Sequence, residues 1–126
     1  MPWIDIHLDC AAGAGAPGAA RHAAVAALRA RGCVDQHWLD QVQLIVSELV
    51  SNAVQHAGGC LSVSVGLTAG SVTVAVADPS RHRPQLFGPD RAKGHGLWIV
   101  DHLSSSWGAA HRAYGKQVWV RLPPCP

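Results

Sequence analysis

The sequence predicts an α+β fold, a two-layer sandwich in which a mixed, mostly antiparallel sheet carries its helices on one face. Three observations lead to this fold class. Segments with strand periodicity are separated by tight turns, which favours antiparallel pairing of consecutive strands. Two segments with helical periodicity follow the first strand. A third helical segment separates the next two strands from the last two.

The first half of the chain predicts one strand and two helices. Residues 4–8 alternate apolar and polar side chains, which is typical of a strand. A helix is expected from Pro17 to just before Gly32, because proline suits a first helical turn and glycine suits a helix end. Asp35 is a suitable N-cap for a second helix, which Gly58-Gly59 ends.

The second half predicts two pairs of strands on either side of a loop and a helix. Each pair is joined by a short turn, and the loop has no apolar period. The expected elements are strands over 61–67 and 72–76 joined at 68–71, a loop over 79–95, a helix after Gly96, and two strands joined at 114–116, the last over 117–122.

Length and composition indicate a single domain over residues 1–126. Apolar residues make up 48% of the chain, enough for a buried core. No apolar stretch is long enough to cross a membrane, and the N-terminus lacks the pattern of a secretory signal. We therefore expect a cytoplasmic protein without a membrane partner. A formal net charge of +2 is too small to indicate direct nucleic-acid binding.

The cysteines and histidines do not have the spacing of a zinc site. Cys10, Cys33, Cys60 and Cys125 lie far apart and form no Cys-x-x-Cys pair, so free structural thiols are expected. No two histidines are four residues apart, which argues against a catalytic zinc helix.

The loop over 79–95 is unusually basic. It holds four of the ten basic residues of the chain, Arg81, Arg83, Arg91 and Lys93. Charged loops are usually just solvated, and that interpretation stays open. The alternative is that the loop covers an anionic group. A structureless loop of this length is uncommon in a small domain unless it has a function.

The second helix carries a polar stripe at the edge of its apolar face. With Glu48 at zero on a helical wheel, Asn52 lies at about 40° and His56 at about 80°, so the stripe drifts into the buried sector. Glu48 is the only Glu and Asn52 the only Asn in the chain. Burying such groups without partners would be costly, so they either satisfy one another and the backbone or form part of a binding site. We favour the binding site, because a chain that otherwise avoids both residue types places them one turn apart.

Two further motifs lie downstream. Asp78 is in phase with the valines of its strand, so its carboxylate is expected on the core side at the strand end. It could instead simply start a turn before Pro79. Gly94-His95-Gly96 leads directly into a helix, where glycines let backbone N–H groups approach phosphate oxygens. The surrounding sequence is neither a Rossmann motif nor a P-loop.

In this order the motifs resemble those of the ATPase superfamily of gyrase, the histidine kinases and MutL. Residues 44–57, LIVSELVSNAVQHA, resemble its N-box. Residues 76–78 and 94–100 resemble its first and second glycine boxes. The short length and residues 115–119, GKQVW, resemble the small bacterial anti-sigma-factor serine/threonine kinases. The resemblance extends from the first helix to near the end of the chain.

The resemblance implies a Bergerat ATP-binding fold with ATP and Mg²⁺ as cofactors. Glu48 would be the general base, Asn52 would bind the metal, and Asp78 would accept the adenine amino group. Residues 79–95 would form a lid. The other nucleotide-binding residues that it implies are His56, Lys93, Gly94, His95, Gly96 and Leu97.

The same resemblance implies a serine/threonine protein kinase that phosphorylates or sequesters a regulatory partner. The partner by family analogy is an anti-sigma-factor antagonist protein; a sigma factor is a second candidate partner, and a homodimer a candidate assembly. One departure keeps an alternative open. Ser80 stands where the family usually has a glycine, two residues after Asp78. The alternative is a non-catalytic switch whose protein binding depends on ATP.

Overall fold

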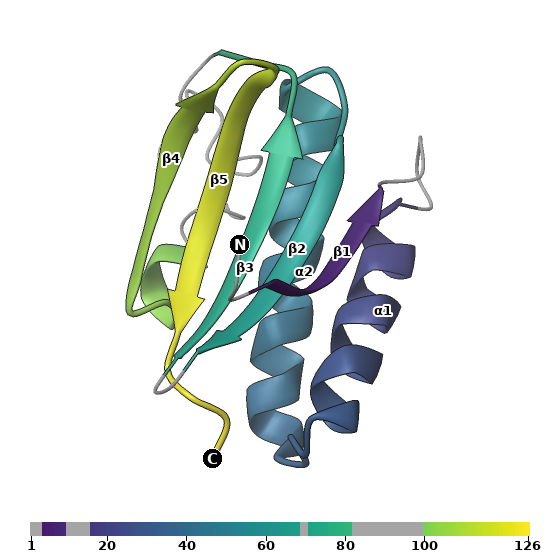
Figure 1. The fold of residues 1–126 in the computed structure, drawn as a ribbon, viewed down its shortest axis with the longest axis vertical. Helices are drawn as coiled ribbons and strands as arrows, with labels where there is room; N and C mark the ends of the chain where they lie inside the picture. The colour runs from purple at the N-terminus through teal and green to yellow at the C-terminus, as the bar shows by residue number, and fades with distance from the viewer. Residues whose placement is uncertain (1–3, 10–15, 69–70, 82–99) are drawn as a thin grey trace.

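The computed structural model describes residues 4–9, 16–68, 71–81 and 100–126. Strands and helices form an α+β two-layer arrangement, which confirms the predicted fold class (Figure 1). Residues 100–103 are also helical. The elements are β1 (Ile4–Asp9), α1 (Ala16–Ala30), α2 (Gln36–His56), β2 (Ser62–Thr68), β3 (Ser71–Asp78), β4 (Ser106–Arg112) and β5 (Gly115–Leu122).

The five strands form one sheet in the order β1-β2-β3-β5-β4. Every pairing among the described strands is antiparallel, whereas a mixed sheet would also contain parallel pairs. The predicted tight turns join β2 to β3, where Thr68 pairs with Ser71, and β4 to β5, where Arg112 pairs with Gly115. Because β3 and β5 are antiparallel neighbours, the end of β3 lies beside the start of β5.

Both long helices cover the same face of the sheet (Figure 1). The core between the layers is built from the apolar side of α2 and from alternate residues of the central strands. Its largest fully buried side chains include Leu39, Ile45, Val74 and Leu122. The alanine-rich α1 packs against α2, since small side chains let two helices approach closely.

The predicted helix ends are confirmed in detail. The Asp35 carboxylate accepts the Trp38 backbone N–H at 2.8 Å, as an N-cap should. Gly32 has a φ of +95°, and the backbone N–H of Cys33 donates to the Leu28 carbonyl at 3.1 Å. That left-handed glycine ends α1 and turns the chain toward α2.

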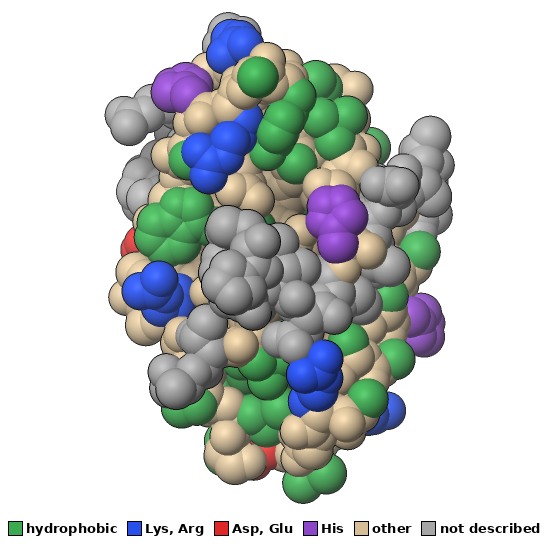
Figure 2. Space-filling model, in the orientation of Figure 1, with side chains coloured by type: hydrophobic (Ala, Val, Ile, Leu, Met, Phe, Trp, Pro, Cys, Tyr) green, Lys and Arg blue, Asp and Glu red, His purple; other side chains and the backbone are tan. Residues whose placement is uncertain are grey.

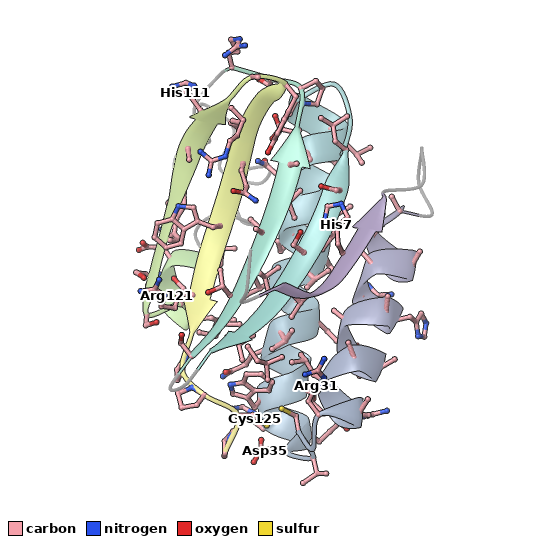
Figure 3. All side chains as sticks on the ribbon, in the orientation of Figure 1. His7, Arg31, Asp35, His111, Arg121 and Cys125 are labelled. Atoms are coloured by element: carbon pink, nitrogen blue, oxygen red, sulfur yellow. The ribbon has the colours of Figure 1, made fainter. Side chains whose placement is uncertain are left out.

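No described helix covers the opposite face of the sheet, which is the face seen in Figure 2. Its described Lys and Arg side chains lie apart from one another (Figure 2). His7 on β1 lies against β2, where its Nδ1 is 3.0 Å from the Ser64 hydroxyl (Figure 3). This contact adds a side-chain link to the backbone pairing of the two strands.

The C-terminal tail returns to the connection between the helices. The Trp38 indole Nε1 donates to the Pro123 carbonyl at 3.2 Å. Cys125 lies at the same end of the molecule as Asp35 (Figure 3) and packs against the core. Burial raises the pKa of the Cys33 thiol to about 11, and the adjacent Cys125 thiol adds to the rise. Both of these thiols are free, as expected.

The expectation of free thiols is wrong for Cys60, which is disulfide-bonded. Spacing along the chain could not reveal this bond, because disulfide pairing depends on which cysteines the fold brings together. Among the described helices, none is both long and apolar enough to span a membrane.

Candidate functional site

The structure places three of the predicted site residues. Glu48 and Asn52 lie on α2 and are half-buried, whereas Asp78 is the last residue of β3 and is buried. His56 is the last residue of α2, and its side chain lies outside the described set. The predicted phosphate-binding residues Lys93, Gly94, His95, Gly96 and Leu97, and the expected lid from residue 82 onward, also lie outside the described residues.

Asp78 forms a buried ion pair with Lys116. The two residues face each other across the β3–β5 ladder, and Lys116 Nζ lies 2.9 Å from Asp78 Oδ1. Asp78 is 2% exposed and Lys116 is 4% exposed. Each occupies a core-facing position of its strand, because side chains two residues apart point to the same side of a sheet. The pair therefore lies on the helix side of the sheet.

Burial makes this pair structurally demanding. Removing one partner of a buried ion pair typically costs about 3–5 kcal/mol, because the other charge is left uncompensated. Replacing both partners with apolar groups of similar volume is often close to neutral. Stability alone therefore does not explain why this ion pair is buried, and a role in ligand binding would explain it better.

The turn after Asp78 is held by the same carboxylate. The backbone N–H of Ser80 donates to Asp78 Oδ1 at 2.8 Å. No described residue other than glycine has a positive φ, so Ser80 needs no glycine-only conformation. The replacement of the usual glycine by serine is therefore compatible with the turn that Asp78 organises.

Gly115 allows the two strands to meet at this point. Its φ is +150°, and a Cβ there would clash with the carbonyl oxygen of Asp78 and with the backbone of Pro79. A side chain at this position would push β5 away from the end of β3. Gly115 therefore sets the distance across which Lys116 reaches Asp78.

The end of α2 meets the end of β3. A Cβ on Gly58 would lie 3.9 Å from Pro79 Cγ, and the backbone N–H of Leu61 donates to the Ala77 carbonyl at 2.7 Å. By helical rise, Asn52 lies about 6 Å and Glu48 about 12 Å before the last residue of α2. The polar stripe of the helix and the Asp78 carboxylate therefore belong to the same end of the molecule.

Glu48 and Asn52 have polar groups that the fold does not use. Within the described part of the chain, neither side chain has a hydrogen bond or an ion pair, including to the other. Both lie at the border of the α2 face that buries Ile45, Leu49 and Ala53. The structural alternative, in which these groups satisfy each other or nearby backbone, is not what the structure shows. Their lone pairs remain open to a ligand.

Sequence reasoning missed Lys116 as a functional candidate. It was assigned to the turn at 114–116, whereas β5 begins at Gly115 and Lys116 is already in the ladder. A signal was present: Lys116 is in phase with Val118, Val120 and Leu122, which all face the core. A lysine on the apolar side of a strand needs a buried anion, and Asp78 was the available candidate.

Comparison with known proteins identifies the family of the chain. Residues 11–122 match the family described as the histidine kinase-like ATPase domain. This match covers most of the chain, so the protein belongs to that family. Family membership implies ATP as the ligand. No curated protein matches the chain.

Two solved structures show similar architecture. A chain of the SiaB–SiaC complex from Pseudomonas aeruginosa is 15% identical with a TM-score of 0.68, and the alignment covers 96% of this chain and 89% of that one. The histidine kinase domain of a blue-light activated histidine kinase from Erythrobacter litoralis EL346 is 22% identical with a TM-score of 0.49, covering 68% of this chain and 44% of that one. The first similarity supports the fold.

The close backbone approach at Gly115 predicts that substitution by alanine destabilises the protein more at Gly115 than at Gly32. We expect Gly32→Ala to lower the free energy of unfolding by about 1 kcal/mol, because only backbone strain is added. Gly115→Ala should lower it by more than about 2 kcal/mol, because strain is joined by a backbone clash. Urea unfolding of both variants checks this, and equal losses would contradict the packing at Gly115.

Proposed function

We propose that this protein is an ATP-dependent serine/threonine protein kinase acting on a regulatory partner protein. The observation that carries the proposal is the unpartnered, half-buried pair of Glu48 and Asn52 in a histidine kinase-like ATPase domain. Asp78, at the same end of the fold, supplies a buried carboxylate for the adenine amino group. ATP would then lie between the end of β3 and the polar stripe of α2.

The oxygen ligands that the described residues offer suit a magnesium ion that binds together with the nucleotide. In the described residues no cluster of three or more His, Cys, Asp or Glu side chains could hold a metal by itself. Mg²⁺ is commonly bound by one or two protein oxygens together with substrate phosphates and water. The amide oxygen of Asn52 is a ligand of the right type. When bound, the metal would neutralise phosphate charge.

Glu48 fits the role of general base. Phosphoryl transfer needs mainly positioning and charge neutralisation, together with a group that accepts the proton of the attacking hydroxyl. The Glu48 carboxylate has no described ion-pair partner that would compete with the substrate hydroxyl for it. It lies one helical turn before Asn52, so the base and the metal ligand share one edge of α2.

The proposed substrate is the hydroxyl of a serine or threonine on an anti-sigma-factor antagonist protein. The structural similarity to a chain from a two-protein complex supports the idea that a fold of this kind binds a protein partner. A sigma factor is a second candidate for binding, and a homodimer a candidate assembly. The competing proposal is a switch that binds ATP and a partner without transferring phosphate.

Loss of Asn52 should weaken the magnesium-dependent part of ATP binding. We expect Asn52→Ala to reduce Mg·ATP affinity at least about tenfold, which corresponds to about 1.4 kcal/mol, while ATP binding in EDTA changes little. Isothermal titration calorimetry measures both. Gln55→Ala is a matched control, because it removes an exposed amide from the same end of α2. An Asn52→Ala protein that stays folded and binds Mg·ATP normally would remove this helix from the site.

Loss of Glu48 should separate catalysis from binding. A general base acts in the transition state, so Glu48→Gln should leave ATP and partner affinity nearly unchanged. Phosphate transfer should fall about 10²- to 10⁴-fold, the usual contribution of a general base. Single-turnover transfer from labelled ATP to a tightly bound partner measures this. If the unmodified protein transfers nothing to such a partner while ATP still alters binding, the switch replaces the kinase.

A further inference from the structure

Only one oxygen of the Asp78 carboxylate, Oδ1, has hydrogen-bond partners among the described residues. Both the Lys116 ammonium, at 2.9 Å, and the Ser80 backbone N–H, at 2.8 Å, donate to Oδ1. No described donor reaches Oδ2. No fully buried polar side-chain atom in the described segments lacks a partner, so Oδ2 is not fully enclosed. One oxygen is therefore fixed by the protein and the other is left to a ligand.

We infer that Lys116 is a positioning residue that determines base specificity, by holding Asp78 so that its Oδ2 accepts the amino group of adenine. This inference rests on the proposed function and deepens it. The Lys116 ammonium donates to Oδ1 and so fixes the rotation of the carboxylate plane. Gly115, one residue earlier, keeps the strands close enough for this contact.

The chemistry of the bases explains why this arrangement discriminates. At the position where adenine presents an amino donor, guanine presents a carbonyl oxygen. An ionised Oδ2 accepts a hydrogen bond from the first and repels the second, and a buried polar group left unpaired is costly. Without the Lys116 contact, the carboxylate is free to rotate about its bond to the side chain, so Oδ2 is no longer held at the base. The difference between ATP and GTP affinity should therefore shrink.

Lys116→Met tests this role, because methionine keeps most of the side-chain volume and removes the charge. We expect the ratio of ATP affinity to GTP affinity, measured by calorimetry with Mg²⁺, to fall at least about tenfold. Arg121→Met is the matched control, since it removes a cation from the same strand at an exposed position away from Asp78. Its ATP to GTP ratio should stay at the unmodified value.

A second variant keeps the test valid if Lys116→Met does not fold. Lys116→Gln leaves a polar donor beside the carboxylate but shortens the side chain and removes its charge, so it leaves the buried carboxylate less isolated than methionine does. Its ATP to GTP ratio should also fall, and an unchanged ratio in a folded Lys116→Gln protein would overturn the role of Lys116. A folded Lys116→Met protein with an unchanged ATP to GTP ratio would overturn the role of Lys116 and leave the ATP site standing. An unmodified protein that binds neither nucleotide would instead overturn the proposed function.

Discussion

The ion pair between Asp78 and Lys116 constrains the end of the sheet where the candidate site lies. Two charges are buried together, so β3 and β5 must stay in register and Lys116 must keep its contact at 2.9 Å. Gly115 makes that register possible, because any side chain there would meet the backbone after Asp78. The Ser80 turn is fixed by the same carboxylate. A small segment of backbone is thus held rigid around one acidic group.

The packing of α2 on the sheet positions the other candidate site residues, Glu48 and Asn52, at the same end of the fold as Asp78. The apolar face of α2 packs on the sheet through residues such as Ile45 and Leu49, which fixes the rotation of the helix about its axis. That rotation places Glu48 and Asn52 at the border of the buried face, half-buried and without described partners. Core packing and site geometry are therefore coupled, since a helix rolled by one position would bury or expose both groups.

Much of this arrangement could be predicted from sequence, because it follows from local rules. Strand alternation, the Asp35 cap and the glycine at the end of α1 each depend on a few neighbouring residues, and each is confirmed. The stripe on α2 is likewise a matter of helical periodicity. The Lys116 contact and the Cys60 disulfide depend on tertiary proximity instead, between β3 and β5 for the ion pair. Of these two contacts, the sequence indicated only the Lys116 contact, because Lys116 is in phase with the valines of β5.

The most direct measurement is a crystal structure of the protein with Mg²⁺ and a non-hydrolysable ATP analogue. We expect the adenine amino nitrogen at hydrogen-bonding distance, about 2.7–3.2 Å, from Asp78 Oδ2, with Lys116 Nζ still on Oδ1. The metal should have Asn52 as its protein ligand. A base bound away from Asp78, or a Lys116 ammonium moved from the carboxylate onto a phosphate, would contradict a site organised by this ion pair.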